Sequence, residues 1–459
     1  MATAKSWLLG LCAPAALAGL CFFSHPRSAP AAADPVEALR PQTDRLIKAL
    51  TEDTQMFSRL AELCDRFGSR MAGSPNIAKA ADFVLAAMKS DGLDGVRGEP
   101  VTVPRFARRE ESLELVSPRS QPMAVMALGG TVSTPKPGLS AELLVVRSFD
   151  ELETRRAEAK DRIVVFAPEW KGYGETVIYR RRSASAAAKH GAVAALVRSM
   201  ASHSIYSVHT GVMKYDDGVP QIPVGAITSE DAELLLRMSK RGDKLQARLR
   251  LVVEPLPEAT DRNVVGELRG RERPNEVVVI GGHFDSWDVG QGAHDDAGNC
   301  VAAWHAVVAM KRLGLRPRRT VRVVMWTAEE LGGIGGDAYA RLHAEQKEKH
   351  VFALEADSGL FRPLGFNVSG GPAQVERTQR HVSLLGSLGA MTVAAGHTGV
   401  DIEPLEKQGT PGLGLKVQNE RYFWYHHTHG DTVDKIDPKD LGQVAATMAV
   451  MAWAASELD

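Results

Sequence analysis

The amino-acid sequence predicts an α/β fold in which a mixed, mainly parallel sheet is flanked by helices. After residue 263, short apolar runs typical of buried strands alternate with segments of helical pattern, as in proteins whose parallel strands are joined by helices. Between about residues 111 and 255 the β-rich runs are shorter and are separated by Ala-rich segments, which predicts a separate small α/β domain. With 459 residues, the chain is long enough for two or three compact units.

These changes of pattern divide the chain into four parts: a signal peptide over residues 1–33, the start of the main domain over 34–110, the inserted domain over 111–255, and the rest of the main domain over 256–459. In the first part, Lys5 precedes an apolar run, and a small-residue stretch offers a cleavage site near Ala33. We therefore expect export, to the periplasm or the outside of the cell. The apolar run is short for a bilayer span of roughly 20 residues, so an uncleaved membrane anchor is the less favoured alternative.

The secondary structure is predicted in order along the chain. Residues 35–93 have helical spacing, with a helix start at Ser74 before Pro75. The inserted domain is predicted to contain strands at 142–146 and 162–166 and a helix over 183–197. The main domain is predicted to contain strands at 277–282, 320–327 and 351–357, a helix from about residue 298 and a helix through Tyr339.

Composition excludes some classes of partner. Lys and Arg total 55 and Asp and Glu total 56, so a net charge of -1 provides no field that would attract nucleic acid or an anionic membrane. The only dense basic run, Arg180 to Arg182, is predicted to be a solvated helix face without function. After removal of the signal peptide only Cys64 and Cys300 remain, and we expect two separately buried thiols rather than a disulfide.

The residues that follow the predicted strands are His, Asp and Glu, at the sheet edge where ligands bind in this class of fold. His283 follows the run 277–282 and is a candidate metal ligand. Asp285 is placed to accept the proton of the other imidazole nitrogen, which would orient the histidine. A histidine held in an ordinary turn is the alternative for such a pair taken alone.

Asp295 and Asp296 precede the next predicted helix, whose first turn favours negative charge. An ordinary helix cap is the alternative, but a cap needs one Asp only. The glycine-rich approach GQGAHDDAGN would allow close packing around a carboxylate that binds metal. Asp295 is therefore a candidate bridging ligand.

Glu329 and Glu330 follow the strand predicted at 320–327, and two adjacent carboxylates repel one another. A metal ion resolves this conflict if one carboxylate binds it and the other acts as a general base beside it. An exposed acidic loop is the alternative for an isolated pair.

Asp357 ends the next strand, and three histidines, His426, His427 and His429, lie among aromatic residues near the C-terminus. Spacing alone does not choose among the three. One histidine from this group completes a set of five ligands, which is what two metal ions with one bridging carboxylate require.

Four motifs, GGHFDSWDVGQGAHDD, VMWTAEELGG, EADSG and HHTHGDT, carry a resemblance to a known family. From about residue 35 to the end, the sequence resembles the zinc exopeptidases that include carboxypeptidase Q and the bacterial leucyl aminopeptidases. The resemblance implies a phosphorylase- or hydrolase-like catalytic domain interrupted by a protease-associated domain, a small peptide substrate such as a dipeptide, and a homodimer. It also implies that the peptide bond after Asp295 is cis.

The resemblance implies a role for each residue: His283 and Asp357 hold one zinc ion, Glu330 and His427 hold the second, Asp295 bridges them, and Glu329 is the general base. More distant relatives carry a tyrosine just before the last histidine ligand, where this chain has His426. His426, Tyr422 or Tyr425 would then hydrogen-bond to the scissile carbonyl, and we expect His426 and Tyr422 to contact the substrate. We find no arginine cluster for an acidic side chain at the C-terminus of the substrate.

Two other functions fit the same fold. A receptor-type domain would have lost its metal ligands, whereas all of them are present in this chain. A glutaminyl cyclase would bind one zinc ion rather than two and would release a cyclised product. Whether peptides are trimmed from the amino or the carboxyl end stays open.

Overall fold

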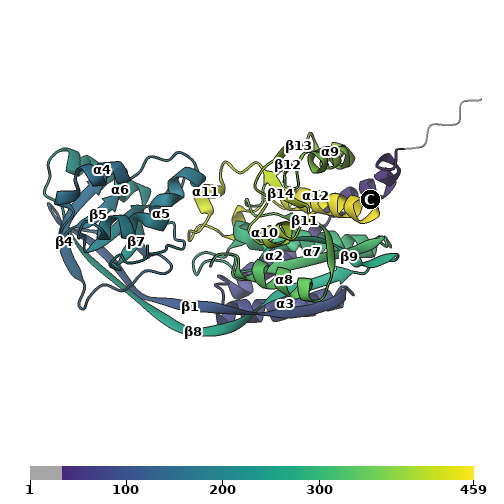
Figure 1. Ribbon diagram of the computed structural model, residues 1–459, viewed down its shortest axis with the longest axis horizontal. Coiled ribbons are helices and arrows are strands. Elements are labelled where there is room, and N and C mark those ends of the chain that lie inside the picture. Colours follow the sequence, from purple (N-terminus) through teal and green to yellow (C-terminus); the bar gives the residue numbers. More distant parts are fainter. Residues whose placement is uncertain (1–33, 459) are drawn as a thin grey trace, which may run out of the picture. The chain divides into compact units, whose positions relative to one another are not determined.

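The computed structural model describes residues 34–458, and the predicted signal peptide lies outside them. Residues 35–458 belong to one compact unit. Two long antiparallel strands, β1 (Asp94–Ser117) and β8 (Gln246–Leu268), connect the two lobes of this unit (Figure 1). We call residues 118–245 the small lobe, and residues 35–93 together with 269–458 the large lobe.

The large lobe is built on a sheet that continues from β8. Its other strands are β9 (Arg273–His283), β10 (Arg319–Trp326), β11 (Lys349–Glu355), β12 (Pro363–Val368), β13 (Thr392–Ala395) and β14 (Gly412–Val417). The order across the sheet is β13, β12, β14, β11, β9, β10, β8. The neighbours from β14 to β10 are parallel, whereas β8 is antiparallel to β10 and β12 is antiparallel to β14. The predicted mixed sheet is therefore confirmed.

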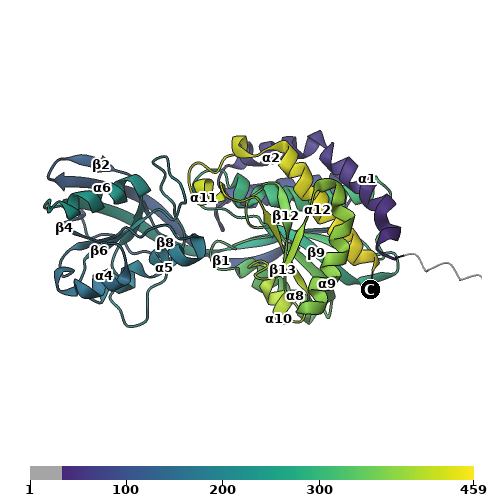
Figure 2. The ribbon, with the colours of Figure 1, turned by 90° about the horizontal axis from the view of Figure 1, so that it is seen from above.

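Helices cover both faces of this sheet (Figure 2). The helices of the large lobe are α1 (Arg40–Thr51), α2 (Thr54–Phe67), α3 (Pro75–Ser90), α7 (Gly298–Arg312), α8 (Ile334–Glu345), α9 (Pro372–His381), α10 (Glu403–Lys407), α12 (Pro438–Glu457) and the short α11 (Tyr422–Tyr425), which lies towards the small lobe. Successive side chains of a strand point to opposite faces. Accordingly, Val278 and Ile280 of β9 pack in one core with α7 and α12, while Val277 and Val279 pack in another with α8 and α10. Because both faces of the sheet are buried, its central strands are apolar throughout and do not alternate between apolar and polar residues.

The strands of the small lobe continue the same sheet, because β4 pairs antiparallel with β8, and buried cores cover both faces of this part. Its strands are β2 (Gln121–Met123), β3 (Val125–Ala127), β4 (Leu139–Val146), β5 (Ile163–Phe166), β6 (Ala194–Arg198) and β7 (Val224–Ile227), and its helices are α4 (Phe149–Thr154), α5 (Tyr173–Ala188) and α6 (Ser229–Lys240). Strands β4 to β7 are parallel neighbours, and β3 pairs antiparallel with β7. The two strands predicted in this region are β4 and β5.

The helix predicted over residues 183–197 is wrong in its second half. Helix α5 ends at Ala188, and the chain turns at Gly191 with a φ of 78°, a conformation that glycine adopts readily. The following residues form β6, which is buried between two parallel neighbours. Alanine is compatible with both a helix and a strand, so the pairing of β6 with its neighbours in the sheet determines that these residues form a strand.

The predicted domain boundaries at residues 110–111 and 255–256 lie within β1 and β8, the two strands that connect the lobes. The assignment of the small lobe to a protease-associated domain stays a prediction. Cys64 and Cys300 are both buried and unpaired, as expected. Between residues 34 and 458, no helix combines the length and apolar composition needed to cross a membrane.

Candidate metal centre

Three neighbouring parallel strands deliver the predicted site residues to one edge of the sheet. His283 is the last residue of β9 and is paired with Trp326, the last residue of β10. Glu329 and Glu330 follow β10, and Asp357 follows β11. Because β9 lies between β10 and β11, the three strand ends meet in one place.

A first group of possible metal ligands consists of His283, Asp295 and Asp357. Nε2 of His283 lies 3.1 Å from Oδ1 of Asp295 and 3.4 Å from Oδ1 of Asp357. His283 and Asp295 are buried, and Asp357 is partly buried. An imidazole nitrogen and two carboxylate oxygens are donors that Zn²⁺ accepts.

A second group consists of Asp295, Glu330 and His427, all buried. Nε2 of His427 lies 2.9 Å from Oε2 of Glu330 and 3.3 Å from Oδ2 of Asp295. Asp295 therefore belongs to both groups and turns a different oxygen towards each. This is the arrangement that a carboxylate bridging two metal ions requires.

The electrostatics of this cluster fit cations. Oε1 of Glu330 is buried without a hydrogen-bond partner. Burial, together with the nearby carboxylate of Asp295, raises the pKa of Glu330 well above its usual range. Several buried carboxylates that repel one another are stabilised when metal ions neutralise them, so the donor set suits bound zinc.

Glu329 is partly buried and lines a cavity of about 340 Å³ together with Glu330 and Asp357. Burial, together with the negative charges of Asp357 and Asp285, raises the pKa of Glu329 to about 8. A cation beside it would lower this pKa again, because it stabilises the carboxylate. A carboxylate in this position, outside both ligand groups, can act as a general base.

Asp285 lies beside the site, but its carboxylate does not accept the imidazole N–H of His283 as predicted. Nδ1 of His283 is 3.0 Å from the backbone carbonyl oxygen of Asp285 and 3.7 Å from its carboxylate. The carboxylate oxygens instead accept the backbone N–H groups of Glu329 at 3.1 Å and Glu330 at 3.4 Å. Asp285 therefore orients His283 through its main chain and holds the two glutamates through its side chain.

Other buried groups hold the ligands in place. Asp431 accepts the backbone N–H of Asp295 at 3.1 Å, and Trp287 Nε1 donates to Oε2 of Glu330 at 2.6 Å. The backbone N–H of His283 donates to Oδ2 of Asp296 at 3.1 Å. The peptide bond between Asp295 and Asp296 is cis, as the resemblance implies. Such outer partners fix the orientation of ligands before any ion binds.

The three C-terminal histidines have different positions. Only His427 contacts Glu330, while His429 is exposed. His426 is buried, with Nε2 3.6 Å from Oδ2 of Asp295. The hydroxyl of Tyr422 donates to Oδ1 of Asp295 at 3.0 Å, so both predicted substrate contacts lie at the centre. The ring of Tyr425 instead stacks on His294.

The small lobe contributes residues that sequence reasoning missed. His209, in the segment between β6 and β7, has Nε2 3.0 Å from Nδ1 of His426. Tyr173 and Arg180 of α5 line the same cavity as Glu329. Arg180 is buried, so the prediction of a solvated arginine face is wrong for this residue. Arg181 and Arg182 are exposed, and Arg181 also lines the cavity. No local motif marks these residues, because the fold brings them to the site from a distance in sequence.

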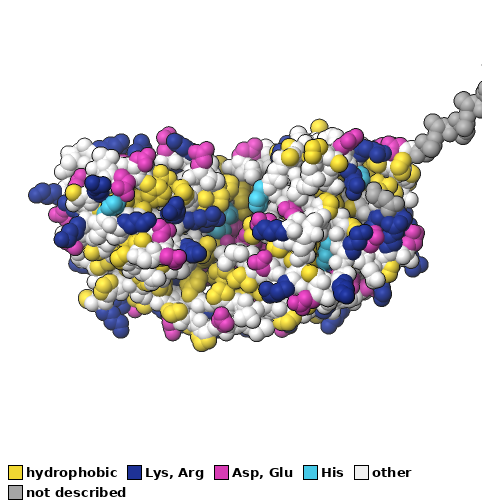
Figure 3. Space-filling view, viewed as in Figure 1, with side chains coloured by type: hydrophobic (Ala, Val, Ile, Leu, Met, Phe, Trp, Pro, Cys, Tyr) yellow, Lys and Arg dark blue, Asp and Glu magenta, His cyan; other side chains and the backbone are white. Residues whose placement is uncertain are grey.

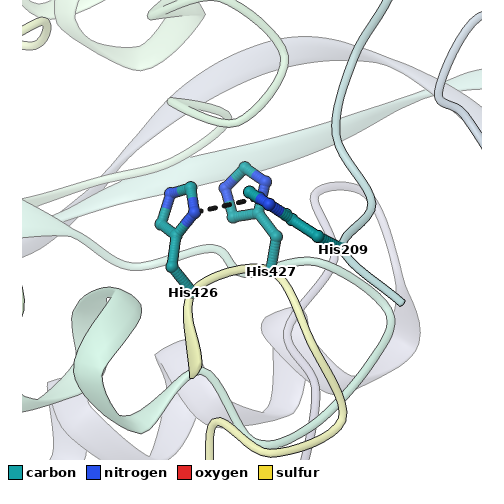
Figure 4. A group of neighbouring side chains, drawn as sticks. All are labelled: His209, His426 and His427. Carbon is teal, nitrogen blue, oxygen red and sulfur yellow. Dashed lines mark hydrogen bonds between the residues drawn. The ribbon is translucent and has the colours of Figure 1, made fainter. Parts of the chain in front are cut away.

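Figure 4 shows that His209, His426 and His427 converge. Their nitrogen atoms are close enough to hold a metal ion. However, Nε2 of His427 faces Glu330, and its Nδ1 lies 3.1 Å from the carbonyl oxygen of Thr210. Both nitrogens of His427 therefore have partners, and we interpret the cluster as a hydrogen-bonded wall of the cavity.

The chain is similar to known peptidases. The profile of peptidase family M28 matches residues 263–452. Carboxypeptidase Q of Mus musculus is 44% identical over 403 residues, which cover 88% of this chain and 86% of that protein. Carboxypeptidase Q of Homo sapiens is 42% identical over 403 residues, with coverages of 88% and 85%.

Two solved structures extend the comparison. A peptidase M28 precursor from Shewanella amazonensis has a TM-score of 0.89 at 34% identity, covering 92% of this chain and 98% of that one. A zinc aminopeptidase from Bacillus subtilis has a TM-score of 0.66 at 19% identity, with coverages of 88% and 95%, and it shares the fold.

Proposed function

The chain belongs to peptidase family M28, and on that premise we propose that it is a two-zinc exopeptidase that hydrolyses dipeptides or other short peptides. The observation that carries the proposal is Asp295, whose two carboxylate oxygens face two separate groups of metal ligands. A site for one ion needs no such shared carboxylate.

The proposed ligands divide between the two ions. His283 and Asp357 hold the first ion, Glu330 and His427 hold the second, and Asp295 is shared. Bound zinc ions supply Lewis-acid chemistry, polarising the scissile carbonyl and lowering the pKa of water.

The protein residues carry the protons. Glu329 lines the cavity without belonging to either ligand group, so its carboxylate is free to accept a proton from the attacking water. The same carboxylate then returns the proton to the nitrogen of the leaving amine. Asp285 keeps Glu329 in position by accepting its backbone N–H.

His426 is the better candidate for a hydrogen bond to the scissile carbonyl. The hydroxyl of Tyr422 already donates to Asp295, whereas Nε2 of His426 is 3.6 Å from that carboxylate. Burial lowers the pKa of His426 to about 4, so the ring is neutral at pH 7 and keeps one N–H to donate. His209, at Nδ1 of His426, orients this ring.

The size of the cavity supports a short substrate. Its volume of about 340 Å³ is at the lower end for small-molecule sites. Tyr173 from the small lobe and Phe423 from the large lobe stack on one another, with ring centroids 4.7 Å apart, and form part of its wall. A small peptide fills such a space. Basic and acidic side chains are interspersed over the face drawn in Figure 3, so no large field of one sign opposes an uncharged substrate.

The two rival functions are less well supported. A receptor-type domain needs none of the acidic ligands, and these are all present at contact distance. A single-zinc cyclase leaves the double use of Asp295 unexplained. Export through the N-terminal segment and assembly as a homodimer are further parts of the proposal.

The proposal is tested by counting metal ions and assaying peptides. Purified full-length protein should contain two zinc ions per chain by mass spectrometry of the metal, and it should release free amino acids from a panel of dipeptides. One ion per chain with cyclised product would favour the cyclase, and metal-free protein that cuts no peptide would favour the receptor.

A further inference from the structure

One guanidinium, that of Arg108, joins the two lobes beside the metal centre. Arg108 lies on β1, and its side chain is only 6% exposed. Nε donates to Oδ2 of Asp288 in the large lobe at 3.0 Å, and Nη2 donates to the other oxygen of the same carboxylate. Nη1 donates to the carbonyl oxygen of Ala127 and to Oγ1 of Thr210 in the small lobe, both at 3.0 Å. We call the contacts of Arg108 with Asp288 and Thr210 the interlobe link.

The interlobe link differs from the ion pair at the next position of β1. Arg109 pairs with Glu254 of β8, and both side chains are about half exposed. That pair joins two strands that are already hydrogen-bonded to one another, and water and salt screen it. The guanidinium of Arg108 is buried, and all three of its nitrogens have acceptors. A two-pronged contact of this kind fixes the geometry of the groups that it joins.

Each end of the interlobe link lies beside the second group of possible metal ligands. Asp288 follows Trp287, whose indole N–H donates to Oε2 of Glu330 at 2.6 Å. Thr210 contacts His427 twice through its main chain. Its N–H donates to the carbonyl oxygen of His427 at 3.0 Å, and its own carbonyl oxygen lies 3.1 Å from Nδ1 of that histidine. The link therefore joins the residue that supports Glu330 to the residue that supports His427.

The contact with Thr210 determines which nitrogen of His427 is available to a cation. A carbonyl oxygen only accepts hydrogen bonds, so Nδ1 of His427 carries the hydrogen and donates it. Nε2, which lies 2.9 Å from Oε2 of Glu330, then keeps its lone pair for a metal ion. The small lobe thus sets both the tautomer and the orientation of this histidine.

We propose that Arg108 positions His427 for the second zinc ion. By joining Asp288 to Thr210, it holds the small lobe at the place where Thr210 orients the ring. The inference rests on the proposed function, because it concerns one of the two ligand groups of that site. The first group, His283, Asp295 and Asp357, lies wholly in the large lobe. Breaking the interlobe link should therefore weaken the second ion and spare the first.

The test uses variants that break the interlobe link at different atoms. Arg108→Gln removes the charge and the two-pronged contact with Asp288. Thr210→Val removes Oγ1 but keeps the main-chain contacts with His427. Arg109→Gln is the matched control, because it removes an ion pair from the adjacent position of β1. Each full-length protein is loaded with zinc and titrated with a chelator, and the zinc that stays bound is counted by mass spectrometry of the metal.

We expect Arg109→Gln to release its two ions as the wild type does. Arg108→Gln should bind one ion with roughly 10- to 100-fold lower affinity, as for loss of an outer partner of a ligand, and the other ion with unchanged affinity. Thr210→Val should weaken the same ion. Because both changes break one link, the double variant should lose no more affinity than Arg108→Gln alone. Asp288→Asn, at a partly exposed side chain, serves as the second variant if Arg108→Gln does not fold.

Three outcomes would overturn the proposal. Equal weakening of both ions would make Arg108 a residue that stabilises the fold in general. Losses that add up in the double variant would show that Arg108 and Thr210 act by separate routes. Unchanged zinc affinity in Arg108→Gln would show that the interlobe link does not position the ligand at all.

Hydrogen exchange of the metal-free protein separates this inference from the proposed function. The amide of Thr210 donates to His427, so the segment 208–212 should exchange faster in Arg108→Gln than in the wild type, and Arg109→Gln should not differ from the wild type. Faster exchange in a protein that binds one zinc ion or cleaves no peptide would count against the two-zinc exopeptidase alone. Unchanged exchange in a two-zinc peptidase would count against the role of Arg108 alone.

Discussion

Asp295 faces His283 with one carboxylate oxygen and His427 with the other. Oδ1 lies 3.1 Å from Nε2 of His283, and Oδ2 lies 3.3 Å from Nε2 of His427. The two histidines are 144 residues apart in the sequence; His283 ends β9, whereas His427 follows α11. A single buried carboxylate therefore connects the two candidate ligand groups, and changing it should affect both.

Asp295→Asn should lower the occupancy of both zinc sites, because it removes the charge and one ligand oxygen from a shared residue. We expect less than one zinc ion per chain, and a loss of activity larger than the roughly 10- to 100-fold that follows loss of an outer partner. His283→Ala should remove mainly one ion, since His283 belongs to the first group alone. Metal analysis after dialysis measures both. His429→Ala is the control, because this histidine is exposed in the same segment. A full complement of zinc in Asp295→Asn would contradict the shared role.

Glu329→Gln should separate metal binding from chemistry. Glu329 is in neither ligand group, so zinc content should stay at the wild-type level. Loss of a general base lowers kcat by about 100- to 10,000-fold. The measurement is steady-state hydrolysis of a dipeptide, with zinc determined on the same sample. Retention of near-normal kcat, or loss of zinc in parallel with activity, would assign Glu329 another role.

Three of the proposed metal ligands, His283, Glu330 and Asp357, could be predicted from the sequence because each ends or follows a strand whose apolar run is visible locally. His283, Glu330 and Asp357 reach one edge as a consequence of strand order alone. Residue spacing alone did not identify which C-terminal histidine is the ligand, because the conformation of the chain after the short α11 determines which ring points into the site. The resemblance selected His427, and its contact with Glu330 agrees with that choice.

The small-lobe residues of the site could not be predicted in this way. His209 and Arg180 lie in a region whose sequence pattern predicts a separate α/β domain, and neither belongs to a recognised motif. Three consecutive arginines look alike in sequence, yet only the packing of α5 against the loop at Gly211 buries the first of them. Long-range packing, rather than local pattern, determined these contacts.

Trp287→Phe should weaken the binding of the second zinc ion, although it changes none of the proposed ligands. The indole N–H donates to Oε2 of Glu330 at 2.6 Å, and phenylalanine keeps most of the apolar packing but has no donor. Loss of such an outer partner should lower zinc affinity by roughly 10- to 100-fold. Competition with a chelator, followed by residual activity, measures the change. Trp304→Phe is the matched control, because its buried N–H has no hydrogen-bond partner. Equal chelator sensitivity in the two variants would show that the hydrogen bond does not support the ligand.

His381→Gln should make the stability of the protein less sensitive to acid. Burial, together with the positive charges of Arg377 and Arg380, lowers the pKa of His381 from 6.5 to about 4. Between these two values the unfolded chain binds a proton that the folded protein does not, so stability is lost as the pH falls from about 6.5 to about 4.

The variant lacks this titrating group. As the pH falls from about 6.5 to about 4, the decrease in its free energy of unfolding should therefore be smaller than the decrease in the wild type, by roughly 1 to 3 kcal/mol. Denaturant unfolding at pH 7 and pH 4.5 measures the difference. Since His381 ends α9, away from the cavity that contains Glu329, dipeptide hydrolysis at pH 7 should not change. Parallel pH dependences in the two proteins would mean that His381 binds its proton at the same pH in the folded and the unfolded state, and that its buried position is not what makes the fold sensitive to acid.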